Sequence, residues 1–279
     1  MGSDFFICNT HSNFLEIRGE DCAEFLQGLI TNDIYKCQKN NPIYSCLLSP
    51  QGKFLADFFI AKQPYGYLVE IHEKYYSSFL SKLEIYRLRS KVNFNKNNNI
   101  SSIIVFFDKD KNIKNSIISF KDPRNDNIGE KFFISNNNND KIKIEKLNEN
   151  SFEKYKEILL KNLVPFCPDD LEENKSLLLE NNLQNLKSID WDKGCYVGQE
   201  ITARMKYRAL LKKKIYSLEI ISGEINVGDN IILGKISIGK VISKVNKYVL
   251  CMLKIENANE NSKKKDKIEI NNSITLKYL

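Results

Sequence analysis

The hydrophobic positions of the first hundred residues follow two different periods. Apolar residues three and four positions apart predict helices over residues 22–33 and 75–87, and Asp21 is placed to cap the first of them. Apolar runs bounded by turn residues predict strands over 45–48, 54–61, 67–71, 91–94 and 103–107. Pro50 and Gly52 favour a hairpin turn between the first two runs. This mixture is typical of an α+β domain with a mixed or antiparallel sheet.

A polar stretch and a helix follow. Residues 108–150 are rich in Asn, Asp and Lys, and we expect loops there, including a low-complexity segment over 136–140. Ser151 is placed to cap a helix that ends before Pro165. One face of this helix is expected to carry Phe152, Tyr155, Leu159 and Leu163.

The pattern changes again after the basic stretch at residues 212–214. Short apolar runs separated by Gly223, Gly228 and Asn246 predict several short strands. Strands at such spacing favour a small β-barrel or sandwich. We therefore expect one α+β domain over 1–210, made of two intertwined subdomains, and a β-barrel domain over 211–279.

Composition narrows the class of protein. Hydrophobic residues make up 42% of the 279 residues and charged residues 28%, which is the balance of a soluble globular protein. Because no apolar run reaches the length of a membrane span and no secretory signal is present, we expect a cytoplasmic protein without a membrane partner. The net charge of +7 comes from lysines scattered through Asn-rich loops. It leaves open a weak tRNA contact at 212–214, although compositional bias explains the charge as well.

Histidine and cysteine usage disfavours a metal site. The chain has two histidines and seven cysteines, and no two cysteines have the C-x-x-C spacing. We expect free thiols and no resident metal ion.

The segment with the clearest chemistry is residues 193–200, which read Lys-Gly-Cys-Tyr-Val-Gly-Gln-Glu. Its two glycines allow a tight loop that can approach a ligand closely. Lys193 and Arg204 are cations near Cys195, and nearby positive charge favours a thiolate, which can attack, exchange or ligate metal. The alternative is a buried structural cysteine, and the residues alone support both interpretations equally.

Residues 193–200 resemble the K-G-C-Y-x-G-Q-E signature of the YgfZ family of folate-binding iron–sulfur proteins. Further blocks at 18–33, 48–53 and 86–92 are similar to blocks of that family. The resemblance extends from about residue 18 to 208 and more loosely into the β-rich end. This family is related to the glycine cleavage T-protein, an aminomethyltransferase that uses tetrahydrofolate.

The resemblance implies a T-protein-like fold, with sheets and helices around a central folate-binding hole and a small C-terminal barrel. It also implies tetrahydrofolate or a derivative as bound ligand, and a role in assembling or repairing iron–sulfur enzymes, including some that modify tRNA. The implied partners are folate and iron–sulfur client enzymes or assembly proteins.

The resemblance also implies roles for individual residues. Glu180 would reach the pterin ring, with Asn182 two positions on, because a carboxylate suits the two-donor edge of a pterin. A solvated loop glutamate is the alternative. Tyr196 would stack on the pterin or else fill the core. Arg204 would belong to a basic rim that meets the carboxylate tail of folate, with an ordinary surface cation as the alternative, and Lys193 is a further candidate folate contact.

One departure bears on catalysis. Where the T-protein pattern has paired aspartates, this chain has Ala56 and Asp57. Asp57 alone could still act as a base or electrostatic stabiliser, or be a polar residue on a strand face. The sequence thus favours a folate-binding accessory protein that acts through Cys195, with a folate-dependent aminomethyltransferase as the alternative.

A single cysteine cannot hold a cluster, because stable clusters normally take four thiolates. Cys195 would therefore act through a mixed disulfide, a second subunit or an external thiol, and the sequence does not choose among these.

Overall fold

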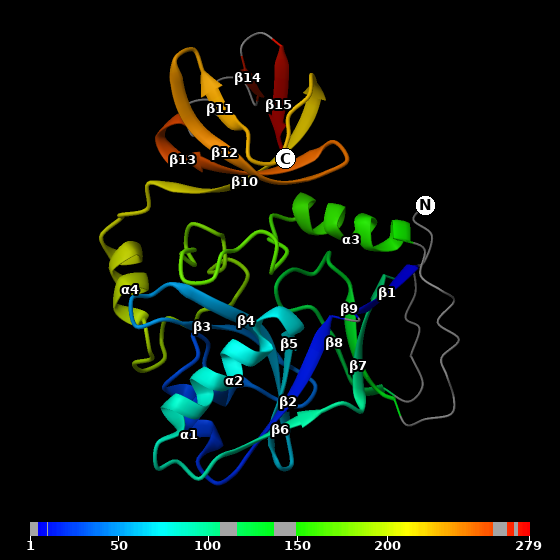
Figure 1. Cartoon of the computed structure of the whole chain (residues 1–279), viewed down its shortest axis with the longest axis vertical. Coiled ribbons are helices and arrows are strands. Elements are labelled where there is room, and N and C mark those ends of the chain that lie inside the picture. Colours follow the sequence, from blue (N-terminus) through cyan, green and yellow to red (C-terminus); the bar gives the residue numbers. More distant parts are fainter. Residues whose placement is uncertain (1–4, 10, 107–115, 137–148, 259–266, 271–272) are drawn as a thin grey trace.

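The computed structural model describes residues 5–9, 11–106, 116–136, 149–258, 267–270 and 273–279. Within these ranges the strands form three sheets in which every pairing is antiparallel. Two sheets and most helices make up the larger part of the molecule, and the third sheet forms a separate cap at the C-terminal end (Figure 1). This arrangement confirms the expected α+β class with a C-terminal β domain.

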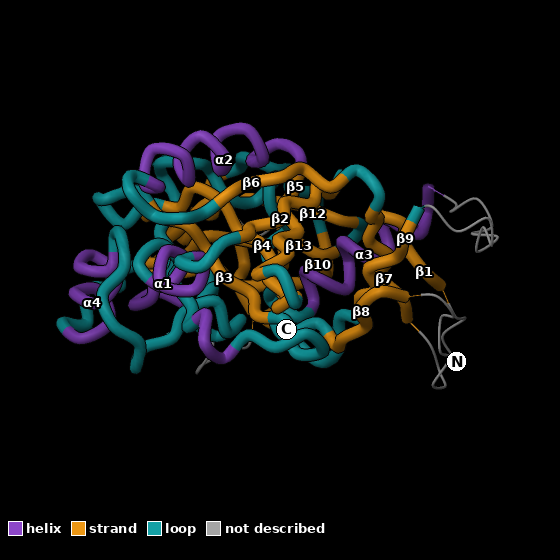
Figure 2. Tube along the Cα trace, turned by 90° about the horizontal axis from the view of Figure 1, so that it is seen from below, coloured by secondary structure: helices purple, strands orange, loops and turns teal. Residues whose placement is uncertain are grey.

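The five-stranded sheet runs in the order β3-β4-β5-β2-β6. Its strands are β2 (Ser12–Arg18), β3 (Ile43–Leu48), β4 (Phe54–Gln63), β5 (Gly66–His72) and β6 (Asn93–Asn97). The sequence predicted all but β2, a region for which it gave no element. Phe58 and Phe79 lie 4.8 Å apart between ring centroids, and α2 (Glu73–Arg87) thereby covers one face of this sheet (Figure 2).

A four-stranded sheet packs on the opposite face. Its order is β1-β7-β9-β8, with β1 (Phe5–Asn9), β7 (Ile100–Phe106), β8 (Ser116–Lys121) and β9 (Glu130–Ser135). Phe14 meets Phe133 at 5.0 Å between ring centroids, and Phe59 meets Phe120 at 6.0 Å. The expectation of loops throughout 108–150 is therefore wrong for 116–121 and 130–135, where aromatic side chains supply the apolar burial. The expected low-complexity segment at 136–140 lies outside the described residues apart from Asn136.

The first helix is shorter than predicted. Helix α1 covers Cys22–Gln27, and a short 3-10 turn follows at Ile34–Lys36. Ile30 instead makes a β-bridge to Leu47. Asp21 precedes the helix without capping it through its side chain, because its carboxylate accepts the backbone N–H of Lys91 at 2.7 Å.

The helix after the polar stretch also differs at both ends. Helix α3 spans Glu149–Lys161, so it begins two residues before Ser151. Tyr155 and Leu159 are buried as expected. Leu163 lies beyond the helix with a φ of 53°, because the chain turns back toward Pro165. A long run of turns then leads to α4 (Gln199–Tyr207), which the sequence pattern did not reveal.

The C-terminal sheet has six strands in the order β11-β12-β13-β10-β15-β14. They are β10 (Lys213–Ser222), β11 (Asn230–Leu233), β12 (Ile236–Val245), β13 (Tyr248–Lys254), β14 (Lys267–Ile270) and β15 (Ile274–Tyr278). The edge strands β11 and β14 contact each other, which nearly closes the sheet into the expected barrel. Its first strand begins two residues after the boundary predicted at residue 211.

Helix α3 lies between the larger part and the barrel (Figure 1). Leu160 packs against Ile215, Tyr248 and Leu250, and the Ser217 hydroxyl donates to the Leu160 carbonyl at 2.5 Å. The two parts therefore share a buried apolar contact. Among the described helices, none is long and apolar enough to cross a membrane.

Candidate functional site

Cys195 lies in the loop that enters α4, and its side chain is exposed. The next residue, Tyr196, is 7% exposed and points into the core. Gly198 begins the helix with a φ of 80°, a left-handed conformation that glycine adopts without strain. The loop thus presents the thiol outward and anchors the tyrosine inward.

Lys193 fastens this loop to the end of α1. Its ammonium group donates to the carbonyl oxygens of Gln27, Ile30 and Asn32 at 2.8, 2.7 and 2.9 Å. A lysine has three N–H donors, so all of them are used within the protein. Burial lowers the pKa of Lys193 to about 8, while the carboxylates of Asp33 and Asp190 act in the opposite direction. The side chain therefore holds the loop in place and has no donor left for folate or for Cys195.

Two glycines bring the hairpin turn against the same loop. A Cβ atom on Gly198 would lie 2.4 Å from the Ser49 carbonyl oxygen, and one on Gly52 would lie 3.0 Å from the Gly198 carbonyl oxygen. The backbone N–H of Val197 also donates to the Gly28 carbonyl at 3.0 Å. Three sequence blocks that are far apart along the chain thus meet around Cys195.

The buried side of the loop contains one unusual atom. The Tyr196 hydroxyl is buried and has no hydrogen-bond partner among the described residues. Burial, followed by the nearby Cys46 thiol, raises the pKa of Tyr196 far above its usual range. The centroid of its ring lies 5.1 Å from the Lys193 ammonium, so the ring makes a cation–π contact with that lysine.

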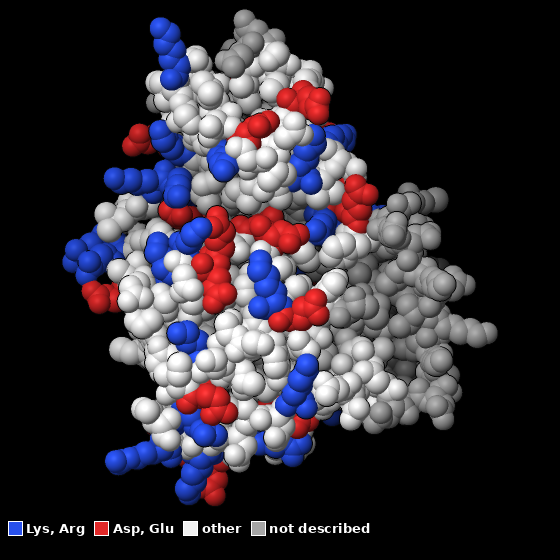
Figure 3. All heavy atoms as spheres, in the orientation of Figure 1, with Lys and Arg blue, Asp and Glu red and all other residues white. Residues whose placement is uncertain are grey.

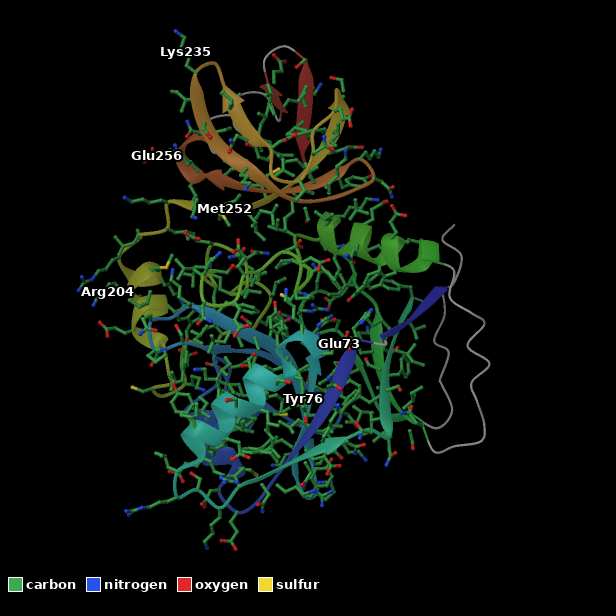
Figure 4. All side chains as sticks on the ribbon, viewed as in Figure 1. Glu73, Tyr76, Arg204, Lys235, Met252 and Glu256 are labelled. Atoms are coloured by element: carbon green, nitrogen blue, oxygen red, sulfur yellow. The ribbon has the colours of Figure 1, made fainter. Side chains whose placement is uncertain are left out.

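Aromatic and basic side chains meet where Trp191, just before the loop, contacts helix α4. The Lys206 ammonium sits 3.8 Å from the Trp191 ring centroid, and the rings of Trp191 and Tyr207 meet edge to face at 6.3 Å. Arg204 pairs with Glu200 one turn earlier on α4, at 2.5 Å. It lies on the outer edge of the molecule, where Lys and Arg side chains gather (Figures 3 and 4).

Asp57 occupies a different place, half-buried on the face of β4 that packs against the four-stranded sheet. The Tyr44 hydroxyl donates to its carboxylate at 2.9 Å. Burial raises the pKa of Asp57, while Tyr44, the Arg124 charge and the Cys167 thiol counteract this shift. Arg124 itself is held by the buried carboxylate of Asp122 at 2.8 Å. Asp57 is thus a half-buried member of a polar cluster and does not lie on a fully exposed strand face.

Glu180 and Asn182 lie within a run of turns. Glu180 is 15% exposed at its side chain and pairs with Lys213 at 3.5 Å, where the chain enters the barrel. The Asn182 amide donates to the Leu163 carbonyl at 2.8 Å, and its oxygen accepts from Asn185.

The expected folate-binding residues therefore fit a ligand only in part. Asn182, Lys193 and Arg204 use polar groups within the protein, whereas Glu180 is loosely paired and the Tyr196 hydroxyl is unpaired in the described structure. The structure brings Lys193, Cys195 and Tyr196 together and leaves Asp57 and Glu180 as separate positions.

Sequence reasoning missed several of these features. Cys46 and Cys167 both lie close to Asp57, and burial raises the pKa of each thiol well above its usual range. The Trp191–Tyr207 contact could have been suspected from the single tryptophan close to the motif. The Arg124–Asp122 ion pair could not be recognised from the sequence, because opposite charges two residues apart are common in loops.

Comparison with known structures establishes the fold. The chain superposes on the glycine cleavage system aminomethyltransferase T of Bartonella henselae with a TM-score of 0.70, at 10% identity, over 99% of this chain and 84% of that one. The chain has the T-protein fold. Because only 10% of the residues are identical, this match shows the fold and nothing about function.

Sequence comparison adds more specific relatives. The chain is 29% identical over 223 residues to the iron-sulfur cluster assembly factor IBA57 homolog, mitochondrial, of Mycosarcoma maydis, over 75% of this chain and 55% of that protein. It is 22% identical over 229 residues to the mouse iron-sulfur cluster assembly factor IBA57, mitochondrial, over 74% and 63% of the respective chains. The chain thus spans little more than half the length of these relatives. No family model matches it.

Proposed function

We propose that this protein is an accessory factor in iron–sulfur cluster assembly or repair and that it acts through the thiol of Cys195. The observation that carries the proposal is an exposed cysteine on a loop that Lys193 and Gly198 fix firmly. The similarity to proteins named as iron–sulfur cluster assembly factors supports the same function.

The chemistry of one thiol limits what the protein can do alone. Among the described residues, no group of three or more His, Cys, Asp or Glu side chains is placed to hold a metal ion. A cluster handled here would be cargo, with one ligand from Cys195 and the others from a partner protein or a small thiol. A mixed disulfide at Cys195 remains an alternative.

A rescue experiment tests the proposal. Cells that lack their own factor are supplied with wild-type protein, Cys195→Ala or Asp57→Ala, and the activity of an affected iron–sulfur enzyme is measured. We expect rescue by wild type and Asp57→Ala but not by Cys195→Ala. Full rescue by Cys195→Ala with failure of Asp57→Ala would overturn the proposal and favour folate-dependent aminomethyl transfer. Immunoblots establish that all three proteins accumulate equally.

Folate binding is a separate proposal, with Glu180 as its main contact. Glu180 is partly accessible and its pairing with Lys213 is long, so a pterin amino group could replace the lysine. Quenching of the single tryptophan, Trp191, is measured during titration with tetrahydrofolate. We expect Glu180→Gln to weaken binding at least about tenfold, whereas Glu172→Gln, an exposed control, leaves it unchanged. Equal binding by wild type and Glu180→Gln would contradict this assignment.

The remaining partners are open to direct tests. A weak tRNA contact through Lys212, Lys213 and Lys214 requires an affinity that falls steeply as salt increases. The cytoplasmic location stays a prediction, and the relatives described above are mitochondrial by name. Cell fractionation with an antibody against the full chain decides between the two compartments.

A further inference from the structure

A groove runs between α3 and the C-terminal barrel, away from Cys195. Its inner part is a cavity of about 280 Å³, and its outer part opens into a hollow of about 800 Å³. The two parts share Lys156, Val227, Lys244 and Val245, so they form one continuous space. Ligand sites commonly lie at such junctions between domains.

The inner end of the groove is polar. Asp170 is only 8% exposed, and one of its carboxylate oxygens accepts the backbone N–H of Phe166 at 2.6 Å. Ser243 lies close to this carboxylate, yet its buried hydroxyl has no partner with hydrogen-bond geometry among the described residues. A buried hydroxyl without a partner is costly unless water or a ligand satisfies it.

The walls next to these two groups are apolar. They are formed by side chains from α3, the turn after it and β12, namely Leu159, Leu160, Val164, Phe166, Ile242 and Val245. At the mouth, Phe152 is 38% exposed and Val227 is 60% exposed. A molecule that enters would therefore lie against apolar surface and meet a carboxylate and a hydroxyl at the far end.

The nearby charges restrict the ligand further. The Lys156 ammonium is paired with Asp169 at 2.6 Å and covers the Phe166 ring at 4.5 Å, so its charge is largely compensated. Lys244 lines both parts of the groove. Burial raises the pKa of Asp170 to about 6, so its carboxylate is charged at neutral pH and has no ion-pair partner among the described salt bridges. A buried carboxylate in this state is stabilised by an opposite charge placed beside it.

We propose that this groove binds a small molecule with a protonated amine on an apolar body, the amine being held by Asp170 and Ser243. The ammonium group would donate hydrogen bonds to the Asp170 carboxylate and the Ser243 hydroxyl oxygen. The apolar body would lie between Leu159 and Ile242. This site is independent of Cys195 and of the proposed role in cluster assembly.

The test compares matched probes on the full chain. Phenethylamine and phenethyl alcohol have the same apolar body and differ in the charged group. Binding to wild type at pH 7.5 is measured by isothermal titration calorimetry. We expect phenethylamine to bind at least about tenfold more tightly than the alcohol. Equal binding of the two probes, or no binding of either, would overturn the proposal and indicate a groove filled by water only.

Two variants locate the binding. Asp170→Asn keeps an oxygen to accept the Phe166 N–H but removes the charge, so we expect phenethylamine to bind at least about tenfold more weakly. Asp126→Asn, at an exposed loop position, serves as the control and should bind as wild type. Val227→Trp fills the mouth from an exposed position and should abolish binding with little effect on folding.

The pH dependence gives an independent readout. Below pH 6 Asp170 takes up a proton, whereas phenethylamine keeps its charge, so binding should weaken between pH 7.5 and pH 5. The other charged groups that line the groove are Asp169, Lys156 and Lys244 in its inner part and Glu153 at its mouth. The drop should disappear in Asp170→Asn, and a drop of the same size in that variant would contradict the assignment. Cys195→Ala should bind phenethylamine like wild type, which separates this inference from the proposed function.

Discussion

The loop around Cys195 and the interior around Asp57 are both rich in polar groups, but they are built in opposite ways. In the loop, a buried lysine and close glycine contacts hold the backbone so that one thiol faces solvent. In the interior, Asp57 is enclosed by Tyr44, Arg124 and Cys167, and its pKa is raised by burial. Both regions contain cysteines, but only the loop exposes its thiol. The comparison teaches that solvent access, which the fold decides, determines which cysteine can react.

The largest difference between the two regions should appear in thiol reactivity. With native protein and iodoacetamide at pH 7.5, we expect Cys195 to be alkylated about 1000 times faster than Cys46. Cys46 is fully buried, burial raises the pKa of its thiol, and it becomes accessible only when the structure opens. Peptide mapping by mass spectrometry measures the two rates separately.

Denatured protein is the control for this measurement, because both thiols should then react at similar rates. Fast alkylation of Cys46 in the native state would show that the interior is open to solvent and would erase the distinction between the regions.

The next largest effect concerns the anchor of the loop. Lys193→Met removes the donor from three backbone carbonyls at the end of α1, and we expect the free energy of unfolding to fall by about 3 kcal/mol. Urea denaturation followed by circular dichroism measures this change. Lys206→Met, which loses only an exposed stacking contact, should cost less than about 1 kcal/mol. Equal losses in the two variants would mean that Lys193 is not the anchor.

The interior carboxylate should show a smaller effect of opposite sign. The folded pKa of Asp57 is raised above its unfolded value, so the folded state loses stability as pH rises through these two values. Asp57→Asn removes the buried charge and still accepts the Tyr44 hydroxyl. We expect it to be as stable as wild type or up to about 1 kcal/mol more stable at pH 7.5.

That advantage should shrink as the pH falls, because the raised pKa of Asp57 lets the folded wild type take up the proton earlier than the unfolded chain. Urea denaturation at pH 7.5 and at lower pH checks the sign. A variant that is less stable than wild type at pH 7.5 would show that the Asp57 charge stabilises the cluster through Arg124.

The smallest expected effect lies on the exposed side of α4. Arg204→Gln breaks a surface pair with Glu200, and we expect the free energy of unfolding to change by less than about 0.5 kcal/mol. Thermal unfolding at low and high salt measures this. If the rescue of iron–sulfur enzyme activity falls in the same variant, Arg204 contributes to partner binding and not to folding.

Local patterns predicted most elements but not their ends. The hairpin of β3 and β4 was predicted because apolar runs flank a Pro and Gly turn. Helix α1 was predicted too long, since Ile30 has helical spacing but joins a β-bridge to Leu47. Strands β8 and β9 were missed because their surroundings are polar, and only packing against Phe14 and Phe59 reveals their role.

The candidate site shows the same division. The motif at 193–200 identified Cys195 and Tyr196 as positions of interest. The sequence also suggested Lys193 as a ligand contact. In the structure its N–H donors instead bind three backbone carbonyls more than 160 positions away in the sequence. Long-range hydrogen bonds of this kind leave no pattern in the local sequence.

The sequence by itself therefore determined the α+β class, the β-rich C-terminal end and the single motif in which a cysteine stands between two glycines. These depend on local periodicity and on conformational preferences of single residues, which act over a few positions. Only the tertiary structure decided that Cys195 faces solvent, that Lys193 is an anchor, and that Asp57 is half-buried beside Tyr44 and Arg124. Exposure, desolvation and hydrogen-bond partners arise from segments that meet in space, and the order of residues along the chain does not contain them explicitly.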